Sequence, residues 1–264
     1  MQSGPVSADL DAKVNAPRGI QSIEVGGLLL QALARQGRPM ALKDLARAAD
    51  MAPAKAHPYL VSFGKIGMVE QDESARYGLG PLAVQLGLIG LQQVDPVRLA
   101  SAELPALARR IGQTVAIAVW GTQGPTIVRI EAGPQAIHVS MRHGSTVSVR
   151  TTAAGKLFAA FGHQRDEMAA VLAQEDAGRP LSKKLAARFD AEIKAVRIGS
   201  IAVVVDQVVV GVSAIAAPVL DAFGQIALAL TAIGPSSTLD TDVTGPVARE
   251  LQAAAQALSH RLGT

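Results

Sequence analysis

The chain has 264 residues, of which 49% are hydrophobic, 18% are charged and only 3% are aromatic. This length suits one large domain or two smaller ones, with a core built mainly from aliphatic side chains. The absence of cysteine excludes disulfides, thiolate zinc sites and cysteine nucleophiles. The formal net charge of +3 permits nucleic-acid binding without requiring it.

The sequence predicts neither a membrane span nor a signal peptide. Its most apolar stretch, residues 201–220, is interrupted by Asp206, Gln207 and Pro218, and we interpret it as two strands and a turn. The N-terminus carries acidic residues and lacks an apolar signal-peptide core. Residues 1–18 are polar and aperiodic, which predicts a disordered arm. We therefore expect a cytoplasmic protein without a membrane partner.

Residues 19–80 have the pattern of three short helices followed by a hairpin. The predicted helices cover about residues 20–36, 42–49 and 53–64, and the predicted strands cover residues 68–71 and 76–79. Ile23, Leu30, Leu33 and Ala34 recur at spacings of three, four and seven along the first helix, which Gly37 ends. This order is typical of a winged helix-turn-helix, whose third helix enters the DNA major groove. The alternative is a helical subdomain with no nucleic-acid role.

Two prolines fall in the third predicted helix. Pro53 suits the first helical position, where a missing N–H has no consequence. Pro58 lies further in, where a proline removes one hydrogen bond and costs roughly 3 kcal/mol. We expect the helix to start late, near Ala54 or Lys55, so that Pro58 lies in its first turn. The alternative is a kink that fits the DNA groove.

A linker helix is predicted for residues 81–95, with an apolar stripe of Leu82, Leu86 and Ile89. Beyond it, short β-branched runs separated by Gly and Pro are typical of antiparallel strands. The expected strands are 114–120, 126–131, 137–141, 201–205, 213–219 and 226–233, and the expected helices are 97–111, 151–161, 181–196 and 247–262. The chain as a whole is thus a mixed α+β protein, in which residues 96–264 form one domain with helices around a sheet of about six strands.

Several short stretches occur along the chain in a recognisable order. They are Gln21-Ser-Ile-Glu24, Leu45-Ala46, Ala56-His57-x-Tyr59-Leu60, Arg76-Tyr77-x-Leu79-Gly80, Thr152-Ala-Ala-Gly-Lys156, Gly211-Val-Ser-Ala-Ile-Ala-Ala-Pro-Val219 and Gly234-Pro235. In this order and spacing the chain resembles IclR-type bacterial transcriptional regulators from Gly19 onward. The resemblance implies a winged helix-turn-helix at residues 19–80 and a GAF-like effector domain. It also implies binding to double-stranded operator DNA as a homo-dimer or tetramer, with no cofactor.

The resemblance implies DNA contacts residue by residue. Where the family's third helix commonly reads Ser-Thr-Val-His-Arg, this chain has Ala54, Lys55, Ala56, His57 and Pro58. The histidine is kept, a lysine replaces the hydroxyl pair, and the arginine is lost. The residues expected to contact DNA are Arg18, Lys43, Pro53, Ala54, Lys55, His57, Pro58, Tyr59, Lys65 and Arg76.

The resemblance also implies a small-molecule site between the sheet and the helix that begins near Thr152. The residues expected to line it are Val139, Val147, Ala153, Ala154, Val204, Val212, Ala214, Thr231 and Ile233. Because nearly all of these are apolar, the expected effector is an aromatic or short apolar acid, whose anionic group would meet N–H groups at the helix start. Alternatively, the same residues only pack the core.

Motifs for other chemistry are incomplete. The stretch from Gly211 lacks the last glycine of a nucleophile elbow, and Gly155-Lys156 lacks the flanking glycine and hydroxyl of a P-loop. We interpret His138 and His143 as surface residues rather than metal ligands, and Asp206 and Asp221 as turn residues. The sequence therefore predicts a regulator that is not an enzyme. The alternative is a small-molecule sensor or enzyme on a GAF-like domain without a DNA role.

Overall fold

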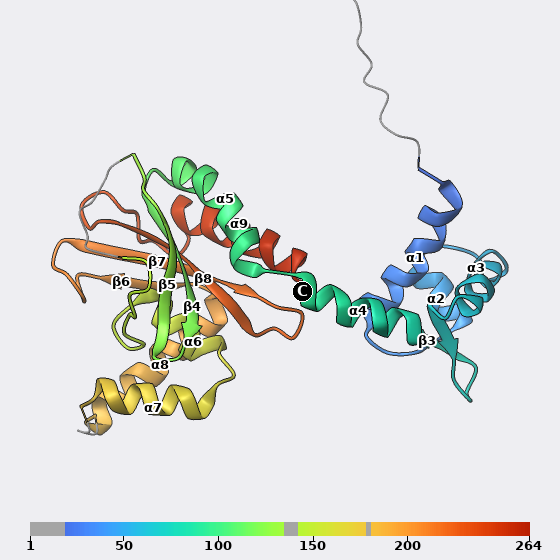
Figure 1. The fold of residues 1–264 in the computed structure, drawn as a ribbon, viewed down its shortest axis with the longest axis horizontal. Coiled ribbons are helices and arrows are strands. Elements are labelled where there is room, and N and C mark those ends of the chain that lie inside the picture. Colours follow the sequence, from blue (N-terminus) through green and yellow to red (C-terminus); the bar gives the residue numbers. More distant parts are fainter. Residues whose placement is uncertain (1–18, 135–141, 178–180) are drawn as a thin grey trace, which may run out of the picture. The chain divides into compact units, whose positions relative to one another are not determined.

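The computed structural model describes residues 19–134, 142–177 and 181–264. The chain divides into two compact units, one ending at Gln93 and the other beginning at Val94 (Figure 1). The predicted arm at residues 1–18 and the predicted strand at residues 137–141 lie outside the described residues, together with Arg18, His138 and Val139.

Helices and one small sheet make up the described part of the N-terminal unit. The helices are α1 (Gln21–Gln36), α2 (Leu42–Ala48), α3 (Pro53–Lys65) and α4 (Pro81–Gln93), and the strands are β1 (Met40–Ala41), β2 (Val69–Gln71) and β3 (Arg76–Leu79). The strands are antiparallel in the order β1-β3-β2, so the predicted hairpin gains a third strand. A strand of two residues, such as β1, is too short to produce a recognisable alternation.

A single apolar cluster joins α1, α2, α3 and the small sheet. Its fully buried members include Leu29, Leu45 and Leu60, each at most 1% exposed. Of the residues whose spacing predicted α1, Leu33 is buried in this cluster, whereas Ile23, at 68% exposed, and Ala34 face solvent. The predicted end of α1 is confirmed, since Gly37 takes the left-handed conformation with φ of 65°.

Pro58 lies in the middle of α3, and the predicted late start of this helix is wrong. The helix begins at Pro53, so Pro58 is its sixth residue and leaves the carbonyl of Ala54 without an intrahelical donor. Pro58 and Ala54 are both exposed, which lets water hydrate that carbonyl. The hydroxyl of Ser62 also donates a hydrogen bond of 2.9 Å to the Pro58 carbonyl. The proline is tolerated because it faces solvent.

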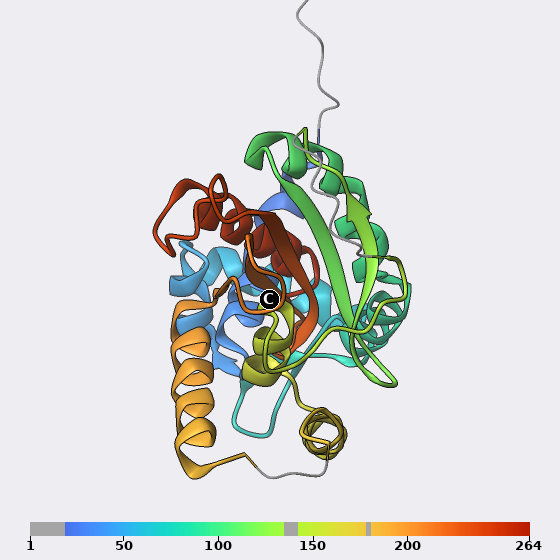
Figure 2. The same cartoon turned by 90° about the vertical axis from the view of Figure 1, so that its left-hand side faces the viewer.

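The C-terminal unit is built around a five-stranded antiparallel sheet with the order β5-β4-β8-β7-β6 (Figures 1 and 2). The strands are β4 (Thr114–Gly121), β5 (Gly124–Glu131), β6 (Ala202–Val205), β7 (Val212–Leu220) and β8 (Ile226–Pro235). The helices are α5 (Pro96–Ile111), α6 (Ala153–Phe161), α7 (Arg165–Glu175), α8 (Lys183–Gly199) and α9 (Pro246–Arg261). Helices α5 and α9 pack on one face of the sheet, and α6 and α8 pack on the other.

The two faces of this sheet carry side chains of different size. Toward α5 and α9 the strands present larger residues, which include Val115, Ile117, Ile215, Val219, Leu228 and Leu230. Toward α6 they present mostly alanines, namely Ala116, Ala118, Ala214, Ala216 and Ala229. Because side chains alternate along each strand, this difference follows directly from the sequence of β4, β7 and β8. The alanine face leaves room beneath α6.

Helix α7 was missed by the sequence analysis. None of its residues is buried, so it has no apolar stripe from which helical periodicity could be recognised. Its half-buried apolar residues include Met168, which packs against the cluster beneath α6, and Val171, which lies beside Gly124 at the start of β5. Polar contacts hold the helix at both ends, as described below.

The position of Pro58 predicts a stability change. Replacing Pro58 with Ala restores the missing hydrogen bond, and should raise the free energy of unfolding by about 2–3 kcal/mol. Chemical denaturation of the full chain measures it, with Pro53→Ala as the control because a proline at the first position removes no helical bond. A Pro58→Ala variant no more stable than the parent would contradict this account of α3.

Candidate functional site

The exposed face of α3 gathers most of the residues predicted to contact DNA. Exposed there are Pro53, Ala54, Lys55, His57, Pro58 and Lys65. The opposite side of the helix is anchored by Ala56 and Leu60, which are at most 1% exposed. Tyr59 differs from the others, because its ring is half-buried and lies beside Gly26 of α1. Lys43, on α2, is also exposed.

Arg76 begins β3 next to the turn of the hairpin. The carboxylate of Asp72 accepts hydrogen bonds from the backbone N–H of Arg76 and of Ser74, each at 2.9 Å, and from Nε of Arg76 at 3.0 Å. These contacts, first of all the bond from the Arg76 backbone N–H, hold the pKa of Asp72 below its usual value. The Arg76 side chain remains 53% exposed, so its other N–H groups are available to an anion.

Two further arginines lie close to these residues and were missed by the sequence analysis. Arg38 and Arg47 line an open groove together with Arg76, beside α2 and β1. Arg47 forms an exposed ion pair of 2.9 Å with Asp44, a kind of contact that contributes little stability. Their positive charge beside a predicted DNA-facing helix was the signal that could have identified them.

A cavity of about 140 Å³ lies between the alanine face of the sheet and the start of α6. Eight of the nine residues predicted to line an effector site line it: Val147, Ala153, Ala154, Val204, Val212, Ala214, Thr231 and Ile233. The ninth, Val139, is outside the described residues. The structure therefore brings these eight residues together around one space.

The remaining wall of the cavity was not predicted. It consists of Ala116, Ala118, Ile127, Thr152, Val208, Val209 and Ser213. Ala116 pairs with Thr231 across β4 and β8, a register that the sequence does not reveal because the two strands are far apart in the chain. Val208 and Val209 come from the loop before β7 and are 61% and 48% exposed. This loop forms the solvent-facing side of the cavity.

A few hydrogen-bonding groups border this apolar space. The hydroxyl of Thr231 is buried and has no hydrogen-bond partner among the described residues. The N–H groups of Ala153 and Ala154 are the first two of α6 and have no acceptor within the helix. The third N–H, that of Gly155, is bonded to the Thr152 hydroxyl at 3.0 Å. Two helix-terminal donors and one hydroxyl can therefore serve a ligand, and the helix dipole favours an anion there.

The wall of the cavity contains no charged side chain among the residues that line it. Helix α6 does carry one buried charge, Lys156, which is only 4% exposed. Its Nζ lies 3.0 Å from Oε2 of Glu192 on α8 and 3.4 Å from Oε1 of Gln207. Burial alone would raise the pKa of Glu192, but hydrogen bonds and charge from Lys156 and Arg188 outweigh it and lower that pKa. Lys156 thus joins α6 to α8 and to the loop over the cavity.

Other kinds of site receive no support from the described residues. Within residues 19–134, 142–177 and 181–264, no three His, Asp or Glu side chains lie close enough together to hold a metal ion. Asp221 accepts bonds of 2.9 Å from the backbone N–H groups of Phe223 and Gln225, and Asp206 accepts one of 2.8 Å from Gly211, as expected of turn residues. None of the described helices combines the length and apolar character needed to cross a bilayer.

Known proteins match both units of the chain. Residues 90–260 match the family profile described as bacterial transcriptional regulator IclR C-terminal, and residues 22–73 match the IclR helix-turn-helix domain. The glycerol operon regulatory protein of Streptomyces griseus is 32% identical over 238 residues, which cover 88% of this chain and 87% of that protein.

Solved structures match as well. The crystal structure of Pseudomonas aeruginosa HmgR superposes with a TM-score of 0.83 at 33% identity, covering 92% of this chain and 98% of that one. The Agrobacterium tumefaciens repressor BlcR shares the fold, with a TM-score of 0.69 at 19% identity over 93% and 98% of the two chains.

These matches confirm the mixed α+β fold, with a helix-turn-helix domain followed by an antiparallel-sheet domain. They also confirm the family resemblance drawn from the sequence, and the family consists of transcriptional regulators rather than enzymes. The chain therefore belongs to the IclR family of bacterial transcriptional regulators, with a helix-turn-helix DNA-binding domain and an IclR-type effector domain.

Proposed function

We propose that this regulator binds operator DNA as a homo-dimer or tetramer, and that a small, largely apolar or aromatic acid in the effector-domain cavity modulates that binding. The observation that carries the proposal is the cavity beneath α6. Its walls are apolar and uncharged, yet they include the unpartnered hydroxyl of Thr231 and the N–H groups that begin α6.

The size of the cavity limits the ligand. At about 140 Å³ it resembles the apolar cavities of roughly 150 Å³ that accept benzene. Each CH₂ group buried there contributes about 0.8 kcal/mol, whereas each hydroxyl left unpaired costs roughly 1–3 kcal/mol. A single ring or a short chain with one carboxylate suits these walls better than a sugar does.

The anionic group has a natural place at the start of α6. The free N–H groups of Ala153 and Ala154 can both donate to a carboxylate, and the positive end of the helix dipole favours it. Thr231 can donate to a second oxygen. The Streptomyces griseus relative is named for a glycerol operon, which makes a polyol the rival class that an experiment should include.

DNA binding rests on local rather than overall charge. Residues 1–80 contain nine Lys and Arg against eight Asp and Glu, so the attraction must come from cations on one face. We assign phosphate contacts to Lys43, Lys55, Lys65 and Arg76, and add Arg38 and Arg47 from the groove beside α2. His57 and the residues around Pro58 occupy the exposed face of α3 that would meet the base edges.

A second copy of the chain would account for the exposed surface of α4. This helix has no charged residue, and it exposes Val84, Leu86, Leu88 and Ile89 at 55%, 49%, 59% and 42%. A helix that is apolar on several sides is usually covered by a partner. Self-association through α4 would also place two α3 helices on one duplex, as half-sites of an operator require.

DNA binding predicts a steep salt dependence. If about half of the six cations assigned in each protomer neutralise a phosphate at one time, a dimer neutralises about six, and the logarithm of the binding constant should fall against the logarithm of salt concentration with a slope near −5. Replacing Lys55 with Ala in both protomers should reduce that slope by about 2. The measurement is a salt series of gel shifts or anisotropy titrations on a duplex from upstream of the protein's own gene.

The control for charge is Lys184→Ala, because Lys184 is exposed on α8 in the effector domain. This variant should keep the parental slope. A parental slope near zero, or an equal loss from Lys55→Ala and Lys184→Ala, would argue against α3 as the DNA-contacting helix.

The α4 surface predicts the oligomeric state. Val84 and Leu88 lie one turn apart, and placing Glu at both should raise the dimer dissociation constant at least about a hundredfold, since each buried apolar side chain contributes about 1.5–3 kcal/mol. Sedimentation equilibrium over a range of concentrations measures the change. Leu185→Glu, on an α8 leucine that is 51% exposed, is the matched control and should leave assembly unchanged. Intact dimers in the double variant would remove α4 from the interface.

The cavity predicts a selective response to ligands. In a thermal-shift panel of benzoate, butyrate, glycerol and glucose, the acids should stabilise the protein; at about a hundredfold excess over Kd the gain is about 2.7 kcal/mol. Ala154→Trp, which fills the cavity, should fold normally by circular dichroism and lose the response. Thr231→Val should stabilise the free protein by about 1 kcal/mol and weaken acid binding several-fold, because it removes an unpartnered hydroxyl.

A response to glycerol or glucose without a response to the acids would show that the proposed ligand class is wrong. Undiminished acid binding by Ala154→Trp would instead show that the ligand occupies a different site. The two results are separate, so the panel tests the class of ligand and its location independently.

A further inference from the structure

Helix α7 ends in two acidic residues, Glu175 and Asp176, at the end where acids are electrostatically unfavourable. The negative end of the helix dipole disfavours carboxylates there, and the last turn contains no basic residue to compensate. No residue of α7 is buried, so apolar packing does not compensate for the unfavourable position of these two acids. Their partners lie in the turn of residues 148–152, directly before α6.

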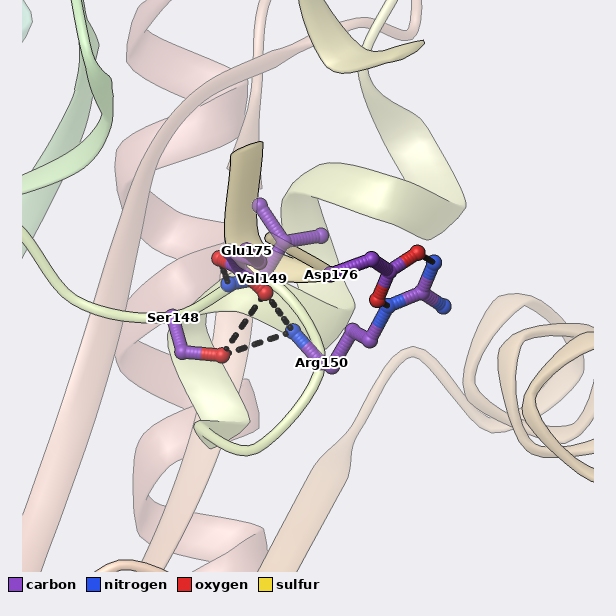
Figure 3. A network of polar contacts seen from close by, with 5 residues as sticks. All are labelled: Ser148, Val149, Arg150, Glu175 and Asp176. Atoms are coloured by element: carbon purple, nitrogen blue, oxygen red, sulfur yellow. Dashed lines mark hydrogen bonds and ion pairs between the residues drawn. The ribbon is translucent and has the colours of Figure 1, made fainter. Parts of the chain in front are cut away.

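Glu175 binds this turn through three donors (Figure 3). Its Oε1 accepts from the backbone N–H of Val149 at 2.6 Å, and its Oε2 accepts from the Ser148 hydroxyl at 2.9 Å and from the Arg150 N–H at 3.3 Å. Val149 is fully buried, so its N–H depends on this carboxylate. One side chain of α7 thereby accepts from two backbone N–H groups and one hydroxyl of residues 148–150.

Asp176 holds the same turn through its side chain. The guanidinium of Arg150 donates from Nε at 3.0 Å and from Nη2 at 2.8 Å to the two carboxylate oxygens, a bidentate pair that is mostly buried. The same guanidinium lies 5.0 Å from the ring centre of Phe189 on α8. Asp176 therefore fastens α7 to the turn, whereas only Glu175 bonds to the backbone of the turn.

The bonds of the turn continue directly into α6. The carbonyl of Ser148 accepts from the Thr152 hydroxyl at 2.6 Å, and that hydroxyl accepts from the N–H of Gly155 at 3.0 Å. Gly155 has no room for a side chain, because an added Cβ would collide with the Ser148 carbonyl oxygen. The turn is thus stacked against the first turn of α6, and a displacement of Ser148 would move the N-terminus of the helix.

We infer that Glu175 is a positioning residue for the effector site: by holding the 148–152 turn, it keeps the Thr152 hydroxyl on Gly155 and leaves the N–H groups of Ala153 and Ala154 free for the ligand's anionic group. Val147, immediately before the turn, lines both the cavity and the groove that Glu175 borders. The inference rests on the proposed binding of an acid, and adds a residue that does not itself line the cavity.

A comparison of benzoate with benzamide tests this role, because the two have the same shape and only benzoate carries the anionic oxygen. In the parent protein benzoate should bind more tightly than benzamide. In Glu175→Ala the benzoate Kd should rise roughly tenfold while the benzamide Kd changes less than about twofold, since charged hydrogen bonds are the strong ones. Glu175→Gln keeps one acceptor oxygen, so its benzoate Kd should lie between those of the parent and of Glu175→Ala.

The matched control is Glu167→Ala. Glu167 lies at the other end of α7 and accepts a bond of 2.9 Å from Nε1 of Trp120, without touching the 148–152 turn. This variant should leave the ratio of the benzamide Kd to the benzoate Kd unchanged. If it lowers the ratio as much as Glu175→Ala does, docking of α7 in general is responsible, and the specific role of Glu175 is refuted.

Hydrogen exchange supplies a test that needs no ligand. Peptides covering residues 148–157 should exchange at least about tenfold faster in Glu175→Ala than in the parent protein, and at the parental rate in Glu167→Ala. Unchanged exchange in Glu175→Ala would overturn the inference. If the parent binds neither benzoate nor benzamide, the proposed ligand class fails instead, and the exchange rates alone decide whether Glu175 holds the turn.

Discussion

The effector domain depends on the difference in side-chain size between the two faces of its sheet. Valine, isoleucine and leucine fill the face beneath α5 and α9, while alanines cover much of the face beneath α6. Aromatic residues make up only 3% of the chain. The ring centres of Trp120 and Phe158 lie 5.7 Å from each other, and neither residue lines the cavity. The alanines of the sheet face Ala153 and Ala154 at the start of α6, and these small side chains leave a cavity rather than a close-packed core.

The same difference decides how the helices are held. The α5 and α9 face buries large side chains, and the ion pairs that join these two helices, such as Arg110 to Glu250, are exposed, so packing is its main anchor. On the other side, polar contacts add to the apolar packing of α6 and α8: the partly buried ion pairs of Lys156 with Glu192 and of Arg150 with Asp176, and the exposed bond from Trp120 to Glu167. Such contacts stabilise only while both partners are present, since removing one leaves a buried group unpaired. The side that holds the cavity is therefore the side on which partly buried ion pairs, in addition to packing, help to set the geometry.

The sequence predicted what depends on periodicity and on short motifs. Most helices and strands came from apolar spacing, and the eight cavity residues came from the family resemblance, with four of them inside the Thr152 and Gly211 stretches. It could not predict features without a buried stripe, such as α7, or features of cross-strand register, such as Ala116 opposite Thr231. Pro58 shows a third limit. Whether α3 tolerates this proline depends on which side of the helix faces water, and the general cost of proline in a helix does not reveal that side.

The covalent link between the two units runs from α4 into α5, so within one chain α5 is the element through which a ligand in the proposed effector site would act on the DNA-binding unit. At Thr231, only the strand β8 separates the cavity from the cluster that contains α5. Thr231 of β8 borders the cavity, while its neighbours Leu230 and Ala232 pack in the cluster that contains α5. A typical coupling of 1–3 kcal/mol needs an element with two arrangements that the ligand distinguishes. Helix α5 has an interior proline, Pro105, which interrupts its hydrogen bonds and gives it a defined point at which to bend. Leu104 and Leu107, which flank this proline, pack in the same cluster as Leu230 of β8, so the central strand and this part of α5 are where a two-state response should be sought.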